Sequence, residues 1–122
     1  MRKSNVTKIK MTFDNSEVTA ELSNNPTSQD FISMLPLTLD FKDYSGTEKI
    51  ANPPRKLSTK SAPAGCTPQK GDITLYAPWG NLAIFYNDFC YASGLVPMGH
   101  ICTGLKELSK LNNTEVKIEV IE

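Results

Sequence analysis

At 122 residues and 13.5 kDa, the chain has the length of one domain with a single core. Hydrophobic residues make up 39% of it and charged residues 21%, which excludes an intrinsically disordered protein. Thirteen basic and thirteen acidic residues cancel, so no overall field draws the protein to nucleic acid or to an anionic membrane. The apolar runs are too short to cross a bilayer and the N-terminus does not read as a signal peptide. We therefore expect a cytoplasmic protein, with export followed by removal of a signal as the open alternative.

The first half of the chain predicts three strands and a helix. Apolar and polar residues alternate in three segments, which predicts half-buried strands over residues 8–13, 18–22 and 37–42. Two starts are open for the helix: Asn25 can cap it with Pro26 at the first helical position, or Thr27 and Asp30 can form a capping box. Pro36 is expected to end it, because a residue before proline avoids the helical conformation.

Residues 50–71 have a different composition from the rest of the chain. They contain four prolines and four basic residues but no acidic residue. We expect a long proline-rich basic loop, within which residues 55–58 can still form a short strand. Two interpretations of its charge remain open, a site for an anionic ligand and a solvated loop. Residues 1–7 are expected to be a flexible N-terminus.

The second half of the chain predicts further strands and a second helix. Four segments have strand patterns, residues 73–76, 81–86, 95–101 and 116–120. Residues 77–80 fit a turn, which places Trp79, the only tryptophan, at the tip of a hairpin. Thr103 is expected to cap the second helix. Seven or eight strands with two short helices indicate a sandwich or a barrel, and a barrel of about eight strands is filled by its own side chains. Any ligand should then bind on the outer wall or at a rim.

The three cysteines are Cys66, Cys90 and Cys102. Their number is odd and no two have CxxC spacing, which argues against a disulfide-rich scaffold and against a zinc site. We expect free thiols, with a single Cys90–Cys102 bridge as the alternative. His100 is the only histidine, and a lone histidine is more often structural than a metal ligand. We therefore expect neither a metal nor a cofactor.

One run of residues has a family resemblance. The segment from Gly71 to Tyr86, GDIxxYxPWGNLAIFY, resembles the signature of the bacterial cyclophilin-like domain family. Three shorter segments are similar to that family too, residues 35–39, 43–49 and 95–99. The similarity covers residues 8–121 and implies a mainly β fold in one domain, residues 1–122. That fold is a closed eight-stranded antiparallel barrel with two short helices packed against it.

The resemblance implies a fold but no settled activity. True cyclophilins share the barrel and catalyse prolyl isomerisation, but a fold does not carry a function with it. Of the segments typical of the catalytic members, Phe-His-Arg and Phe-Met-x-Gln-Gly-Gly-Asp, only residues 70–72 match here. Arg55 is the nearest candidate for the catalytic arginine by position in the chain, and no other catalytic residue is assigned.

The function predicted from the sequence is a binding module for an extended peptide or a small molecule, in a groove on the barrel wall. The expected ligand-binding residues are Tyr44, Glu48, Arg55, Tyr76, Trp79, Phe85 and Tyr86. One alternative is a peptidyl-prolyl isomerase with Arg55 as the donor to the prolyl nitrogen. Another is a structural or protein-interaction domain that binds another protein through the barrel surface. Neither nucleic acid nor a membrane is an expected partner, and the oligomeric state is open.

Overall fold

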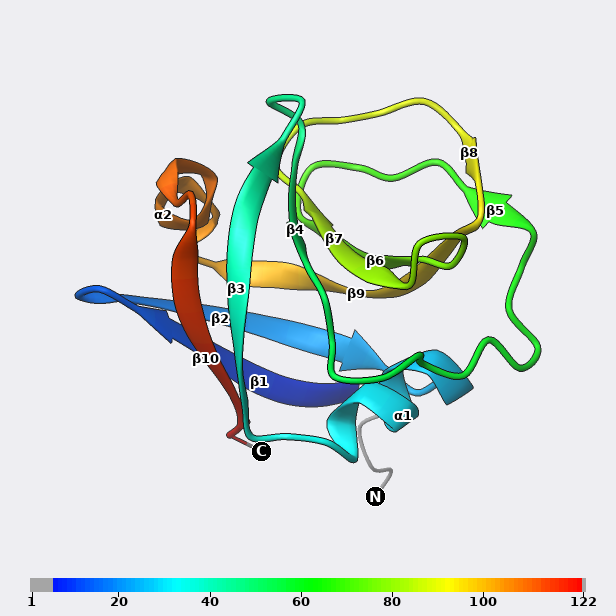
Figure 1. Cartoon of the computed structure of the whole chain (residues 1–122), viewed down its shortest axis with the longest axis horizontal. Coiled ribbons are helices and arrows are strands. Elements are labelled where there is room, and N and C mark those ends of the chain that lie inside the picture. Colours follow the sequence, from blue (N-terminus) through cyan, green and yellow to red (C-terminus); the bar gives the residue numbers. More distant parts are fainter. Residues whose placement is uncertain (1–5, 122) are drawn as a thin grey trace, which may run out of the picture.

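The computed structural model describes residues 6–121 of the chain. Within these residues eight strands form a closed antiparallel barrel in the order β1-β10-β3-β4-β7-β6-β9-β2 (Figure 1). The barrel strands are β1 (Val6–Phe13), β2 (Ser16–Ser23), β3 (Leu37–Tyr44), β4 (Glu48–Ala51), β6 (Asp72–Tyr76), β7 (Asn81–Phe85), β9 (Leu95–Thr103) and β10 (Thr114–Val120). Two short strands, β5 (Gly65–Cys66) and β8 (Ala92–Ser93), pair outside the barrel. The predicted mainly β barrel is confirmed.

The two helices are α1 (Pro26–Ile32) and α2 (Leu105–Lys110). The Asn25 side chain accepts a hydrogen bond from the Ser28 N–H at 2.8 Å and Pro26 opens α1, so the asparagine cap is the one used. The Thr27 hydroxyl donates instead to the Ser58 carbonyl at 2.6 Å. The cap of α2 was predicted wrongly, because Gly104, at a φ of +90°, takes the place expected for Thr103.

The barrel interior is a single apolar cluster. The inward-facing residues of every barrel strand contribute to it, and Phe31 of α1 and Leu108 of α2 add one fully buried side chain each. Because α1 precedes β3, α2 precedes β10 and these two strands are antiparallel neighbours, the helices lie at opposite ends of that strand pair (Figure 1). The interior is occupied by side chains, as expected for about eight strands.

The largest difference from the sequence prediction concerns residues 50–71. The predicted loop is interrupted at both ends, because residues 50–51 belong to the barrel strand β4, Glu48–Ala51, and residues 65–66 form β5. Residues 55–58, for which a short strand was left open, form none. Residues 52–64 form the loop, which Leu57 fastens by burying its side chain in the core. Residues 6–7, predicted as part of a flexible N-terminus, belong to β1, while the remainder of that prediction lies outside the described residues.

All three cysteines are free thiols, so the alternative Cys90–Cys102 bridge does not form. Within residues 6–121, neither helix has the length and apolar character needed to cross a membrane.

Candidate functional site

Strand β7 is buried on both faces, and its outer face identifies the candidate site. Leu82 and Ile84 point into the barrel core, while Ala83 and Phe85 point outward. The outward pair forms a second apolar cluster with Leu95 of β9. A barrel wall that is apolar on its outer side needs a covering layer or a ligand. Here the cover is incomplete and leaves a pocket.

The pocket lies on the outer wall, as predicted for a filled barrel, and has a volume of about 260 Å³. Five of the seven predicted ligand-binding residues line it: Tyr44, Glu48, Tyr76, Trp79 and Phe85. Five further residues line it that the sequence analysis did not assign: Ile50, Asn81, Phe89, Ala92 and Leu95. The volume is close to the lower end of the range for small-molecule sites, about 300–1,000 Å³. It suits a small ligand or one side chain of a larger one.

Strand register explains why residues distant in the sequence meet in this pocket. Glu48 of β4 lies directly opposite Tyr44 of β3 on one side and Phe85 of β7 on the other. Residues directly opposite in antiparallel strands place their side chains on the same face of the sheet. A second row runs from Asn81 across Tyr76 to Leu95 in the same way. The two rows form the floor and sides of the pocket.

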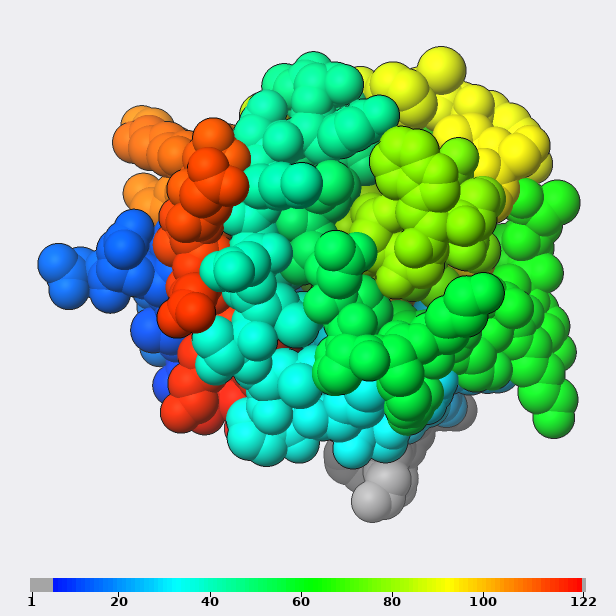
Figure 2. Space-filling view, in the orientation of Figure 1, coloured from blue at the N-terminus to red at the C-terminus, as the bar shows by residue number. Residues whose placement is uncertain are grey.

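Aromatic rings form the rim of the pocket. The Gly80 N–H donates to the Tyr76 carbonyl at 2.8 Å, and Gly80 itself has a φ of +74°, which closes the turn between β6 and β7. This turn presents Trp79 with 63% of its surface exposed. The Trp79 ring meets Tyr44 and Tyr76 edge-on, at centroid distances of 6.0 and 5.3 Å. In Figure 2 the turn (yellow-green) stands beside the β3–β4 hairpin (teal) on the face in view.

Glu48 is the one charged residue among the described residues that line this pocket. Its carboxylate has neither an ion pair nor a side-chain hydrogen bond within residues 6–121. Burial among apolar side chains raises the pKa of Glu48 above its ordinary value. A half-buried carboxylate without a partner costs free energy in the unliganded protein. A cationic ligand would remove that cost.

Asn81 adds a second unsatisfied acceptor. The residue is 4% exposed, and its amide nitrogen donates to the Leu82 carbonyl at 3.0 Å. Its side-chain oxygen is buried and has no hydrogen-bond partner within the described part of the chain. Buried polar groups are nearly always paired, so an unpaired one at a pocket wall points to a missing donor. The signal for this acceptor in the sequence is that Asn81 is the one amide side chain at the start of the apolar run 81–85.

A second hollow of about 280 Å³ adjoins the pocket. Four residues line both, Tyr44, Ile50, Trp79 and Asn81. The second hollow continues past them to Asp40, Lys42 and Asn52. Together the two hollows form a groove across the outer faces of β3, β4 and β7.

Arg55, a predicted site residue, lies away from the pocket. Its guanidinium donates two hydrogen bonds, at 2.9 and 2.7 Å, to the carboxylate of Asp30 on α1. The Ser58 N–H donates to the same carboxylate at 2.7 Å. The Arg55 guanidinium and this backbone donor lower the pKa of Asp30 to about 2. Arg55 therefore fastens the 52–64 loop to α1, and the prediction that it lines the pocket is wrong.

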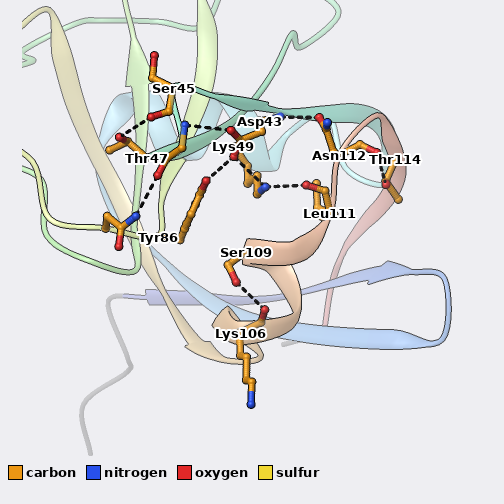
Figure 3. A network of polar contacts seen from close by, with 12 residues as sticks. Asp43, Ser45, Thr47, Lys49, Tyr86, Lys106, Ser109, Leu111, Asn112 and Thr114 are labelled. Atoms are coloured by element: carbon orange, nitrogen blue, oxygen red, sulfur yellow. Dashed lines mark hydrogen bonds and ion pairs between the residues drawn. The ribbon is translucent and has the colours of Figure 1, made fainter.

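Tyr86, the other predicted residue outside the pocket, belongs to a partly buried polar cluster with Asp43 and Lys49 (Figure 3). The Tyr86 hydroxyl donates to the Asp43 carboxylate. The Lys49 ammonium lies 3.0 Å from the same carboxylate, 2.6 Å from the Leu111 carbonyl and 4.8 Å from the centre of the Tyr86 ring. Burial and the hydrogen bond to Asp43 raise the pKa of Tyr86 to about 12. Lys49, only 2% exposed, is therefore not part of a basic surface.

The missed pocket residues differ in how far the sequence could have located them. Ile50 follows Glu48 at the two-residue spacing of a strand, but only Ile50 falls inside the predicted loop of residues 50–71, so the short strand is not apparent from the sequence. Phe89 and Ala92 come from the segment after β7, which reaches the pocket only because β8 pairs with β5. The Phe89 ring lies 5.8 Å from the Phe85 ring, centre to centre. No local pattern in the sequence indicates that long-range pairing.

Comparisons with known proteins agree with the architecture. A family model described as the cyclophilin-like family matches residues 11–120. The solution structure of the hypothetical protein AF2241 from Archaeoglobus fulgidus is similar, with a TM-score of 0.69 and 16% sequence identity over 97% of each chain. At that identity the likeness shows the fold alone. Because the similar structure comes from an archaeon, the bacterial origin that the sequence resemblance suggested stays a prediction. Among curated proteins no sequence relative is found. Because the family model matches most of its length, the chain belongs to the cyclophilin-like family.

Proposed function

We propose that this protein is a binding module whose pocket on the barrel wall takes the cationic group of an organic ligand. The observation that carries the proposal is the Glu48 carboxylate, half-buried and unpaired among aromatic side chains. The ligand is a small alkylammonium compound, or a peptide that offers a lysine or arginine side chain.

The chemistry of the lining supports a cation more than any other ligand group. Aromatic faces attract alkylammonium and guanidinium groups, each contact contributing about 0.5–2 kcal/mol. Tyr44, Tyr76 and Trp79 offer three rings on one side of the pocket, and Glu48 offers the countercharge. The unpaired side-chain oxygen of Asn81 accepts a hydrogen bond from an N–H donor. An anionic ligand would meet a carboxylate and no pocket cation.

The shape of the groove supports a ligand with an extended backbone. The pocket alone holds one cationic group, and the adjoining hollow along β3 and β4 gives room for the residues that follow it. Because Trp79 and Asn81 line both hollows, they would contact such a peptide on each side of the anchored side chain.

The isomerase alternative loses its candidate donor. Arg55 is the only arginine within residues 6–121, and its guanidinium is bound to Asp30 on α1. The proposal therefore assigns binding without catalysis. The three free thiols support a reducing, cytoplasmic location as part of the same proposal. Neither a nucleic acid nor a membrane partner belongs to it.

The test is an NMR titration of the labelled full chain with a matched pair of probes, choline and its uncharged isostere 3,3-dimethylbutanol. We expect choline to shift the amide signals of β4, β7 and the β6–β7 turn, and to change the fluorescence of Trp79. The isostere should bind at least about tenfold more weakly, because it lacks the charge that Glu48 and the rings recognise. Peptides of the form Lys-Xaa-Pro and Glu-Xaa-Pro then separate a peptide ligand from a small one.

Two substitutions locate the site. Trp79→Ala should weaken choline binding, while Tyr91→Ala should leave it unchanged, because Tyr91 is an exposed aromatic residue that does not line the pocket. Equal binding of choline and its isostere would refute the role of charge. An unchanged affinity in Trp79→Ala would place the site elsewhere. Accelerated cis–trans exchange of the prolyl peptides would restore the isomerase reading, and self-association through the aromatic rim would favour an interaction domain.

A further inference from the structure

Three residues with metal-binding side chains meet on the outer wall formed by β2 and β9. Glu21 of β2 lies directly opposite His100 of β9 in the register of the two strands. Cys102 follows two residues after His100 on the same strand. One donor atom from each residue, a carboxylate oxygen, an imidazole nitrogen and the thiol sulfur, lies within 4.8 Å of the other two. His100 and Cys102 are exposed and Glu21 is half-buried, so an ion has open access to all three.

An irregularity in the sheet helps to bring the thiol into this group. Thr19 pairs with Thr103 and the next residue, Ala20, pairs with Ile101, so Cys102 is an extra residue without a partner on β2. Such a bulge bends the strand and changes the direction of the side chains at that point. The Thr19 and Thr103 hydroxyls, 2.7 Å apart, hold the strands together beyond it. The thiol is therefore held beside the Glu21–His100 pair by paired strands and not by a loose loop.

The neighbouring charges leave the three donors free. Asp72 of β6 lies opposite His100 on the other side, but its carboxylate accepts the Gln69 N–H at 2.8 Å. Lys8 of β1 lies opposite Glu21 without forming an ion pair with it within residues 6–121. Within residues 6–121, the charge of the Lys8 ammonium acts on the thiol, and it would oppose an incoming metal ion only modestly because Lys8 is exposed.

We propose that Glu21, His100 and Cys102 form a binding site for a divalent transition-metal ion, with zinc as the ion that fits the donors best. A thiolate and an imidazole select a borderline or soft ion over magnesium or calcium. Donor atoms around tetrahedral zinc lie about 3.3–3.8 Å apart, given metal–ligand bonds of about 2.0–2.3 Å. The three donors need to close by only about 1 Å, within the reach of their side-chain torsions. Three protein ligands leave the fourth position to water.

This site is independent of the aromatic pocket. His100 lies five residues along β9 from Leu95, the strand's contribution to that pocket, which is about 17 Å of extended chain. On binding, the Cys102 thiol loses one proton to the solvent and its sulfur forms the bond to the metal, so binding at constant pH releases a proton. The metal does not change its oxidation state in this step.

The test is a cobalt titration of the full chain without an affinity tag, under reducing conditions. A thiolate bound to cobalt gives a charge-transfer absorption in the near ultraviolet, which a carboxylate and an imidazole alone do not give. We expect the band to saturate at one equivalent and to disappear on addition of zinc. Cys102→Ser should abolish it, and His100→Gln should weaken the affinity by about tenfold or more. Cys90→Ser, which removes another exposed thiol, should leave the band unchanged.

Three results would overturn the proposal. The first is a band that survives in Cys102→Ser or disappears in Cys90→Ser. The second is a titration with no band at a tenfold excess of cobalt. The third is a metal-dependent dimer in sedimentation, since an ion that bridges two molecules needs no three-residue site in one. As a readout independent of the band, zinc should shift the amide signals of residues 21, 100 and 102 and leave those around Trp79 in place.

Discussion

The two faces of β4 each carry one charged residue, and the two residues differ in whether the folded chain supplies a partner for the charge. On the inner face, Lys49 is buried and its ammonium donates hydrogen bonds to the Asp43 carboxylate and the Leu111 carbonyl (Figure 3). On the outer face, the neighbouring Glu48 carries a carboxylate without a partner in the described structure, among aromatic rings. The same alternation separates Phe85, in the pocket, from Tyr86, in the polar cluster.

The difference distinguishes a structural charge from one available to a ligand. A buried charge that is already hydrogen-bonded within the folded chain is not available to bind a ligand. A half-buried charge that makes no hydrogen bond within the protein lowers stability, and only a bound ligand can supply its partner. The polar cluster should therefore respond to mutation in stability, and the pocket in ligand affinity. Four substitutions test this separation, in order of expected effect.

Lys49→Ala should have the largest effect, a loss of about 3 kcal/mol in the free energy of unfolding. Removing one partner of a buried pair leaves the other charge uncompensated, which costs about 3–5 kcal/mol, and here the Asp43 side chain is 30% exposed, which places the loss at the low end. Urea denaturation measures it. Lys42→Ala, an exposed lysine on the adjacent β3, should change stability by less than about 0.5 kcal/mol. Equal midpoints for the two variants would contradict the cluster's structural role.

Tyr86→Phe should cost about 1.5 kcal/mol, because it removes one hydrogen bond to a charged group and keeps the ring over Lys49. The effect should depend on pH. Since the pKa of Tyr86 is raised to about 12 in the folded protein, its contribution is fully present below pH 10 and is lost as the pH rises towards 12. Denaturation curves at pH 8 and pH 11 should show wild type and variant converging at the higher pH. If the difference in unfolding free energy between wild type and variant were the same at both pH values, the hydrogen bond assigned to Tyr86 would be wrong.

Glu48→Gln should raise stability by less than about 1 kcal/mol at pH 7 while abolishing the preference for a cation. The folded protein raises the pKa of Glu48, so it favours the protonated form. Stability should therefore fall as the pH rises through the pKa of the folded state, and the variant should lack this fall. Denaturation between pH 4 and pH 8 measures it. A variant that is less stable than wild type at pH 7 would mean that Glu48 has a partner after all.

Arg55→Ala should have the smallest effect on the pocket, with choline affinity unchanged. Arg55 binds Asp30 on α1 and is not one of the residues that line the pocket. In the wild type, the lowered pKa of Asp30, about 2, means that this ion pair contributes above pH 4 and is lost as the pH falls through about 2. The variant should lose the larger part of that acid dependence and keep the part that the Ser58 N–H contributes. A large drop in its choline affinity would return Arg55 to the site.

The sequence located most of the barrel because its strands have strong local patterns. Apolar and polar residues alternate clearly in β1, β2, β3 and β10. This alternation, and the hairpin around Trp79, can each be recognised within about ten residues of sequence. β4 was missed for a local reason. It has only four residues, its inner face carries a lysine, and it runs directly into the proline-rich loop.

The site was located in part, and the two errors share one cause. Arg55 and Tyr86 have the side chains expected of a ligand site, and both lie close in sequence to residues that do line the pocket. Which way each points depends on partners far away in the chain, Asp30 for Arg55 and Asp43 for Tyr86. The sequence did not predict the group formed by Glu21, His100 and Cys102 for the same reason, since only strand pairing brings residue 21 beside residue 100.

The pairing of β1 with β10 has a consequence for how this protein reaches its native state. Ile9 lies opposite Val120, so the last pairing of the ring joins residues separated by almost the whole described chain. β10 must have been synthesised before that pairing can form, and until then β1 and β3 each expose an unpaired edge. Such long-range closure places folding on the scale of about milliseconds to seconds. The growing chain is therefore most exposed to aggregation in the interval between the synthesis of β3 and the arrival of β10.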